Sequence, residues 1–146
     1  MIKIINFIIL ILMTDTINPD KRSWNMAQIK DKDSKPELIV RSYLHGRGFR
    51  FRTNVKSLPG KPDIVLKKYN TLIFVDGCFW HRHKGCKYAY TPKSRKEFWR
   101  TKFRNNVKRD KIVNEELGKS GWNVHRIWEC EINENNLNSL AKIIKQ

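Results

Sequence analysis

Two segments of this 146-residue chain, Lys61-Pro-Asp63-Ile-Val-Leu66 and Leu72-Ile-Phe-Val-Asp76-Gly77, predict the central hairpin of the fold. Pro62 has a fixed φ and no N–H to donate, so it suits the first residue of a strand or an edge strand. The apolar run after Asp63 predicts a short buried strand, Tyr69-Asn70 predicts a turn, and residues 72–75 predict the antiparallel partner strand. This hairpin places Asp63 and Asp76 at the same end of the sheet.

Two carboxylates at one end of a sheet can hold a hard divalent cation such as Mg²⁺. The structural alternative is that Asp63 caps a turn and Asp76 only opens one, and this alternative is the favoured one for a lone aspartate. The residues after Asp76 reverse that balance, because Cys78-Phe-Trp-His81-Arg-His83-Lys-Gly-Cys86 follows at once. A nuclease needs this combination: a carboxylate for a metal, a base for water and flat side chains that separate bases.

Four soft or borderline metal ligands indicate a zinc site. Three of them lie within nine residues, and the fourth follows the strand-like segment 122–128; they are Cys78, His83, Cys86 and Cys130. Tetrahedral Zn²⁺ takes four such ligands, and three cysteines with one histidine are an established structural set. The alternative is three unrelated buried thiols. His81 lies outside the set, and its neutral imidazole is able to take a proton from water.

The charge of the chain indicates an anionic partner. There are 30 Lys and Arg residues against 14 Asp and Glu, which gives a net charge of +16, and residues 82–111 alone contain twelve basic and two acidic residues. A basic patch of this density suits phosphate backbones. An anionic membrane would also attract it, but the aromatic residues interleaved with the charge favour nucleic acid. The odd number of cysteines argues against a secreted disulfide framework.

The N-terminal part differs in composition from the rest. Residues 2–12 are almost wholly apolar but too few to span a bilayer, and no small-residue cleavage site follows them. We expect Met13 to be the native start; the alternative is a genuine apolar tail. Residues 1–33 are thus predicted to form an apolar extension and a mobile arm, and residues 34–146 a single domain.

The remaining elements follow from helix caps and periodicity. Ser34-Lys-Pro-Glu37 is a capping-box pattern that predicts a helix ending near Gly46. Residues 49–55 alternate like a strand, and Ser94-Arg-Lys-Glu97 predicts a second capping box for a helix ending near Leu117. A strand over 122–128 and a closing helix with Leu137, Leu140 and Ile144 complete the order αβββαβα. The fold class is α/β.

Several motifs resemble the very short patch repair (Vsr) DNA mismatch endonucleases. The resemblance rests on Leu58-Pro-Gly-Lys-Pro-Asp63 and Phe74-Val-Asp-Gly-Cys-Phe-Trp-His81, and runs in order from about Thr14 to the C-terminus. It implies a restriction-endonuclease-like fold, a three-layer α/β/α arrangement around a central mixed four-stranded sheet. The acid-x-lysine triplet usual in that fold is absent here, where Phe74-Val75-Asp76 stands, as expected for the Vsr family.

The resemblance also implies a reaction: Mg²⁺-dependent nicking of one DNA strand 5′ of the thymine in T·G mismatches, which arise when 5-methylcytosine deaminates. Asp63 would bridge two Mg²⁺ ions, the Val75 carbonyl would bind one, and His81 would activate water. Glu37 has two roles open to it, as helix cap and as an acid acting on the metals through water. Asp76 stands where some members carry histidine, so three roles stay open: metal ligand, partner of His81, or neither.

Further residues carry roles implied by the same resemblance. Asp110 is a candidate for supporting the site from behind, and the wedge aromatics are Phe79, Trp80 and Trp99. We expect Phe79 and Trp80 to be exposed, whereas Trp99 has core packing as its alternative. The expected partner is double-stranded DNA with a T·G mismatch, with mismatch-repair proteins as candidate partners, no membrane, and a monomeric protein in the cytoplasm, associated with the nucleoid.

Two other function classes remain open. A site-specific restriction or nicking endonuclease would use the same metal site without a preference for mismatches. A non-catalytic, zinc-stabilised DNA-binding module would explain the charge and the cysteine set, but it would leave Asp63 and His81 without a role.

Overall fold

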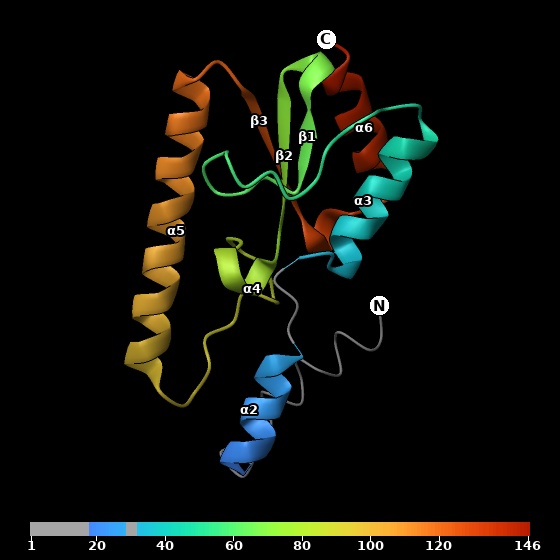
Figure 1. Cartoon of the computed structure of the whole chain (residues 1–146). Coiled ribbons are helices and arrows are strands. Elements are labelled where there is room, and N and C mark those ends of the chain that lie inside the picture. The colour runs from blue at the N-terminus through green and yellow to red at the C-terminus, as the bar shows by residue number, and fades with distance from the viewer. Residues whose placement is uncertain (1–17, 29–31) are drawn as a thin grey trace.

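The computed structural model describes residues 18–28 and 32–146 (Figure 1). The expectations for residues 1–13 lie outside the described residues. The helices are α2 (Pro19–Ala27), α3 (Lys35–Gly46), α4 (Cys78–His81), α5 (Lys96–Lys119) and α6 (Glu134–Ile144). The strands are β1 (Ile64–Leu66), β2 (Thr71–Asp76) and β3 (Asn123–Trp128), with short 3-10 turns at Lys67–Tyr69 and Glu129–Glu131.

The described strands form one mixed sheet in the order β1-β2-β3. β1 and β2 are antiparallel with Ile64 opposite Ile73, which confirms the predicted hairpin, and Asn70 takes a left-handed conformation at its turn. β2 and β3 are parallel, with Ile73 opposite His125 and Asp76 opposite Trp128. Asp63, just before β1, and Asp76, at the end of β2, therefore lie at one end of the sheet as predicted.

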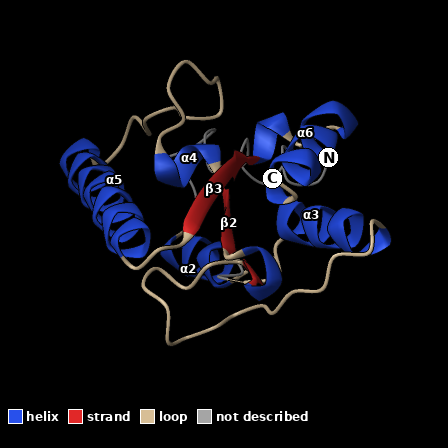
Figure 2. Ribbon diagram, turned by 90° about the horizontal axis from the view of Figure 1, so that it is seen from above, coloured by secondary structure: helices blue, strands red, loops and turns tan. Residues whose placement is uncertain are grey.

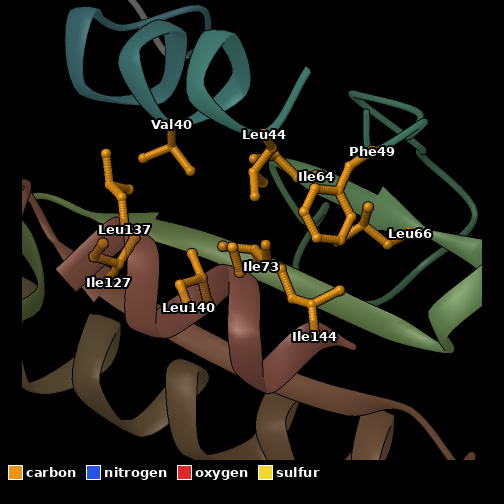
Figure 3. Close-up of a cluster of buried hydrophobic side chains, with 11 residues drawn as sticks. Val40, Leu44, Phe49, Ile64, Leu66, Ile73, Ile127, Leu137, Leu140 and Ile144 are labelled. Carbon is orange, nitrogen blue, oxygen red and sulfur yellow. The ribbon is translucent and has the colours of Figure 1, made fainter. Parts of the chain in front are cut away.

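Helices cover both faces of the sheet (Figures 1 and 2). On one face, α3 and α6 enclose a cluster of buried apolar side chains with the strands (Figure 3): Val40, Leu44, Phe49, Ile64, Leu66, Ile73, Ile127, Leu137, Leu140, Ala141 and Ile144. On the other face, Val113 and Leu117 of α5 pack against Val65, Leu72 and Phe74. Helix–sheet–helix layering and the α/β class are thus confirmed. No helix in the described part of the chain is both long and apolar enough to cross a membrane.

The prediction of a four-stranded sheet is not confirmed, because the described residues form three strands. In the segment 49–55, only Arg52 pairs with the sheet: it exchanges two main-chain hydrogen bonds with Val65, of 2.9 and 2.8 Å. Asn54 has a φ of 53°, in the left-handed region, which turns the chain out of an extended path two residues later. Phe49 is only 1% exposed, so the alternation reflects its burial in the core.

The predicted capping boxes differ from the observed helix starts. Ser34 is the N-cap of α3, but its hydroxyl donates to Oε1 of Glu37 (2.8 Å) and does not accept a main-chain N–H. The second box is wrong: α5 begins at Lys96, after Arg95 with a φ of 49°, and Glu97 pairs with Arg100. α5 also continues through Gly118 to Lys119. Within the predicted arm, α2 lies beyond the end of the sheet that carries α4 (Figure 1), with Trp24 61% exposed.

Candidate active site

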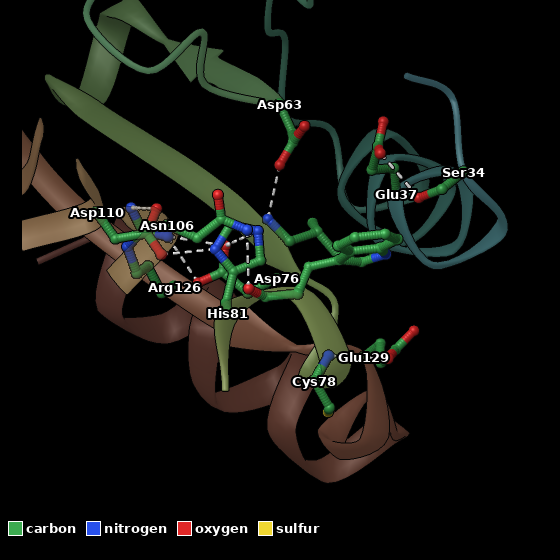
Figure 4. Close-up of polar contacts among 12 residues, drawn as sticks. Ser34, Glu37, Asp63, Asp76, Cys78, His81, Asn106, Asp110, Arg126 and Glu129 are labelled. Carbon is green, nitrogen blue, oxygen red and sulfur yellow. Dashed lines mark hydrogen bonds and ion pairs between the residues drawn. The ribbon is translucent and has the colours of Figure 1, made fainter. Parts of the chain in front are cut away.

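Asp63 is a partly buried carboxylate directly before β1 (Figure 4). Its Oδ2 accepts the main-chain N–H of Val75 at 2.7 Å. Burial raises the pKa of Asp63 to about 6; the Val75 hydrogen bond opposes that rise, and the charges of Glu37 and Asp76 add to it. A bound cation would stabilise the ionised form of a partly buried acid with acidic neighbours, and Mg²⁺ takes oxygen ligands. The donor set at this end of the sheet therefore fits a hard divalent cation.

Glu37 lies in a polar network at the start of α3. Its Oε1 accepts from Ser34 Oγ, and its Oε2 accepts from the main-chain N–H of Asp33 (2.8 Å) and from Nη2 of Arg41 (3.1 Å). Both carboxylate oxygens thus have protein donors, which supports the structural role of Glu37. Arg41 Nη2 also donates to the main-chain oxygen of Asp63 (3.2 Å), so the network joins α3 to the start of β1.

His81 ends the single turn of α4, where Arg82 takes a left-handed conformation. Nδ1 of His81 lies 2.6 Å from Oδ2 of Asp110 on α5 (Figure 4). An ionised carboxylate can only accept, so Nδ1 carries the proton and the lone pair is on Nε2 in the neutral imidazole. Nε2 lies 3.9 Å from Oδ1 of Asp76. The free nitrogen of His81 therefore faces the acidic end of the sheet.

Asp110 is ionised in this arrangement. Burial alone would raise its pKa, but the hydrogen bond to His81 and the charges of His81 and Arg126 outweigh that effect and hold the pKa of Asp110 below its ordinary value. A carboxylate that stays charged behind an imidazole fixes the orientation of the ring and stabilises the imidazolium that forms on proton uptake. The pair is thus arranged for general-base chemistry.

Asp76 is paired with Arg126 from β3. Nη1 of Arg126 donates to both carboxylate oxygens of Asp76, at 2.8 and 2.7 Å, and Asp76 is only 3% exposed. The Arg126 guanidinium also lies 4.5 Å from the centre of the Phe74 ring and donates through Nε to Asn114 (3.1 Å). Asp76 therefore faces two charged partners, Arg126 directly and His81 at a longer distance.

The four predicted zinc ligands come together. One ligand atom from each of Cys78, His83, Cys86 and Cys130 lies within 4.8 Å of all the others. Nδ1 of His83 is 3.6 Å from Sγ of Cys78 and 3.3 Å from Sγ of Cys130. The His83 ring stacks on Trp128, with ring centres 4.3 Å apart and planes 5° apart. Three sulfurs and one imidazole nitrogen at this spacing fit a tetrahedral metal ion such as Zn²⁺.

The aromatic residues of α4 and α5 form one cluster. Phe79 is its centre, with ring centres 4.9 to 5.4 Å from those of Trp80, Tyr90, Trp99 and Phe103. Phe79 is only 8% exposed, so the expectation that it is exposed is wrong: the helical turn after Gly77 points the ring inward against α5. Trp80 and Trp99 are half-buried, and the main-chain oxygen of Trp80 accepts from Asn106 (3.2 Å).

Basic side chains surround this cluster. The ammonium of Lys102 lies 5.3 Å from the Trp80 ring centre, and the guanidinium of Arg95 lies 4.6 Å from that of Phe98, which is 45% exposed. A shallow groove of about 420 Å³ runs along another side of α5; its lining is Arg82, Phe103, Arg104, Val107, Lys108 and Lys111. Cations beside aromatic rings and a groove lined by basic and apolar side chains suit a nucleic acid, with its phosphates and its flat bases.

Comparison with known proteins decides the family. The model of a family described as DNA mismatch endonuclease Vsr matches residues 14–87. The chain belongs to the Vsr family. Its DNA mismatch endonuclease relative from Escherichia coli (strain K12) is 41% identical over 120 residues, which cover 82% of this chain and 76% of the relative.

Other Vsr relatives carry a different name. The type II nicking enzyme V.NmeAIP of Neisseria meningitidis is 46% identical over 139 residues, 91% of this chain and 98% of the relative. The type II nicking enzyme V.XorIIP of Xanthomonas oryzae pv. oryzae is 43% identical over 122 residues, 84% of this chain and 89% of the relative. As a Vsr family member, the chain is a nuclease.

Two arginines of this Vsr family protein were missed in the sequence. Arg41 and Arg126 hold the candidate site together, yet each lies far along the chain from the acid that it contacts across elements, Asp63 and Asp76. One signal was available for Arg126: in the predicted strand 122–128 it lies at the same alternating spacing as Trp122 and Val124 and shares their sheet face. A charged side chain on a covered face needs a partner of opposite charge.

Proposed function

We propose that this protein nicks one strand of double-stranded DNA on the 5′ side of the thymine in a T·G mismatch. The observation that carries the proposal is the pair of His81 and Asp110, in which Nδ1 is turned to the Asp110 carboxylate and Nε2 faces the acidic end of the sheet. Such a base accelerates the hydrolysis of a phosphodiester and has no role in a module that only binds DNA. The family supports a nuclease, and the finer substrate is our proposal.

The proposed cofactor of the reaction is Mg²⁺, held by Asp63 and the main-chain carbonyl of Val75. When bound, the cation would neutralise charge on the phosphate and favour ionisation of the attacking water. The protein's own residues do the rest. Asp63 supplies a negative charge that its Val75 hydrogen bond keeps in place, and Arg41 fixes the main chain of Asp63 against α3. We assign Glu37 to this support, since its oxygens have protein donors.

Proton transfer is assigned to His81. Its Nε2 takes a proton from the attacking water, and the imidazolium that forms is stabilised by the charge of Asp110. The hydrogen bond from Nδ1 prevents the ring from turning, so Nε2 stays on the side of the acidic residues. Asp110 is therefore a positioning residue that acts through His81.

Recognition of the mismatch is assigned to the aromatic cluster. A T·G step is less well stacked than a paired one, so its opening costs less, and a wedge side chain typically has to overcome about a few kcal/mol of unstacking. Trp80 and Trp99 are half-buried and are the proposed wedge, supported from behind by buried Phe79. The basic residues along α5 would hold the phosphate backbone, and the partner is proposed to be mismatched duplex DNA bound by a monomer in the nucleoid.

A structural Zn²⁺ is proposed for Cys78, His83, Cys86 and Cys130. Cys78 begins α4 and His83 follows its end, while Cys130 follows β3, so one ion would join the loop that carries His81 to the edge strand of the sheet. We also propose that the fold is restriction-endonuclease-like, with residues 34–146 as its domain and residues 1–33 as an arm.

The second candidate is a nicking endonuclease that recognises a site without a mismatch. Its support is that relatives of 43% and 46% identity are named type II nicking enzymes. A nicking assay in Mg²⁺, with duplexes that differ only in a T·G or a T·A pair, tests both functions. Cleavage 5′ of the thymine in the T·G duplex alone supports the mismatch enzyme. Equal cleavage of both supports the site-specific enzyme, and no cleavage of either contradicts both.

A further inference from the structure

Asp76 and Arg126 form a buried ion pair in the middle of the candidate site (Figure 4). The sheet register produces it: Asp76 lies opposite Trp128 on the parallel neighbouring strand, and Arg126 lies two residues before Trp128. Nη1 of Arg126 donates to both oxygens of Asp76, at 2.8 and 2.7 Å, and both side chains are largely buried, with 4% of Asp76 and 17% of Arg126 exposed. The opposite charges of such a pair largely cancel at the neighbouring groups.

Arg126 is also held by groups other than Asp76. Its Nε donates to Asn114 on α5, its guanidinium lies over the Phe74 ring, and its Nη2 lies 3.7 Å from Oδ1 of Asp110. The guanidinium therefore spans the two aspartates on either side of His81. Its contact with Oδ1 of Asp110 leaves Oδ2 of that carboxylate for Nδ1 of His81.

Asp63 and Asp76 consequently differ in what they can offer a cation. Asp63 accepts a neutral main-chain N–H and keeps its negative charge. Asp76 has its charge cancelled by a guanidinium, and that guanidinium would repel a cation brought up to the same carboxylate. Of the three roles open to Asp76, metal ligation is the one that this geometry disfavours.

We infer that Asp76 is not a ligand of the catalytic cation in this chain, and that it forms with Arg126 a charge-neutral pair that positions Asp110 and, through it, His81. The inference rests on the proposed nuclease function and assigns two positioning residues to it. Neither side chain touches the reacting atoms in this assignment. Their effect is to fix the direction of the His81 ring and to leave Asp63 as the acid that attracts the metal.

Metal binding without DNA separates this role from ligation. Mn²⁺ is titrated by calorimetry into the zinc-loaded protein and its variants. Arg126→Gln should bind Mn²⁺ more tightly than the wild type, by about 3- to 30-fold, because a nearby positive charge is removed and Asp76 becomes free to bind the metal. The double variant Asp76→Asn with Arg126→Gln replaces one neutral pair by another and should stay within about threefold of the wild type. Asp63→Asn is the reference for loss of a ligand.

Nicking of the T·G duplex gives the second readout. Arg126→Gln should lower kcat by about 10- to 100-fold with little change in KM, since the base is misplaced while the DNA-binding surface is kept. Its metal affinity and its kcat would thus change in opposite directions, which a general loss of structure does not produce. Lys142→Gln removes an exposed positive charge on α6, on the opposite face of the sheet from α5, and should leave both quantities unchanged.

Two results would overturn the inference. Loss of Mn²⁺ binding in the double variant, to the level of Asp63→Asn, would make Asp76 a ligand. Weaker Mn²⁺ binding in Arg126→Gln would make Arg126 part of the general structure only. If Arg126→Gln fails to fold, the double variant decides, because it leaves no buried charge unpaired. A wild type that binds Mn²⁺ as expected but nicks no duplex would contradict the proposed function and leave the pairing decided by the metal titration.

Discussion

Oδ2 of Asp110, on α5, lies 2.6 Å from Nδ1 of His81, on α4. The contact joins two residues that are 29 positions apart, and it fixes the tautomer of the only histidine in the described residues that faces the acidic end of the sheet. It makes the orientation of a catalytic base depend on the packing of the longest helix. The first prediction concerns this pair.

His81→Ala should retain binding to a T·G duplex and lose about 10²–10⁴-fold in nicking rate, the usual cost of losing a general base. Asp110→Asn should lose a comparable part, because an amide can donate to Nδ1 and favour the wrong tautomer. The double variant should be no slower than His81→Ala, since the two residues act as a unit. Single-turnover nicking measures the three rates. Additive losses would contradict the coupling, and unchanged nicking in His81→Ala would remove the assigned base.

Asp63 should make the stability of the Mg²⁺-free protein depend on pH. Its pKa is raised from 3.8 to about 6 in the fold, so the native state binds more protons than the unfolded state between these values. The associated stability is fully present below pH 4 and is lost as the pH rises through about 6. The amide in Asp63→Asn does not titrate. The free energy of unfolding of this variant, relative to that of the wild type, should therefore rise by about 3 kcal/mol between pH 4 and pH 7.

Urea unfolding at several pH values, with zinc retained and no Mg²⁺ added, measures the difference. Addition of Mg²⁺ at pH 7 should stabilise the wild type and not Asp63→Asn, since a ligand that binds the native state shifts the equilibrium toward it. A difference between the two proteins that stays constant with pH would show that Asp63 does not titrate as its burial requires.

The zinc site should contribute to folding. Cys130→Ser removes one ligand of the proposed ion and should destabilise the domain, because the binding free energy of a structural zinc is folding free energy. Glu131 lies 3.5 Å from Nε2 of His83 and orients the ring, so Glu131→Gln should weaken zinc binding by about 10- to 100-fold without abolishing it. Chelator competition and thermal unfolding measure both. Purified protein without zinc, or a fully stable Cys130→Ser variant, would count against the site.

Neighbouring aromatic residues should respond differently to truncation. Phe79 is buried at the centre of the aromatic cluster, so Phe79→Ala should cost about 3–5 kcal/mol of unfolding free energy. Trp80 is half-buried, so Trp80→Ala should cost less stability but reduce the preference for T·G over paired duplex. Chemical denaturation and competition binding measure the two effects. Equal discrimination in Trp80→Ala and the wild type would exclude Trp80 from the wedge.

The sequence was sufficient where local pattern determines structure. The hairpin that carries Asp63 and Asp76 follows from two apolar runs and a turn. The three cysteines and His83 lie together, as expected from the number of ligands that a zinc ion takes. The closing helix was also visible, because Leu137, Leu140 and Ile144 form one buried face. In each case the prediction depends on residues that are close in sequence or on ligands that share one metal ion.

Other features depend on partners that local pattern does not contain. Arg126 meets Asp76 only because β2 and β3 are parallel and in one particular register. The inward direction of Phe79 requires the position of α5, and the left-handed Arg95 delays that helix past its expected capping box. The segment 49–55 alternates between apolar and polar residues like a strand. In the structure Phe49 is buried in the core, and only Arg52 of this segment pairs with the sheet.

α4 has consequences beyond the placement of His81. It is a single helical turn whose first residue is Cys78, and His83 lies two residues past its end, so the proposed zinc ligands enclose the proposed base on both sides. A single helical turn is too short to be stable in isolation. Bound zinc would hold the turn of α4, and with it His81, in one position. An ion that does not contact the substrate would thus be required for hydrolysis. A molecule without zinc would keep all its nuclease residues, but the position of its general base would not be fixed.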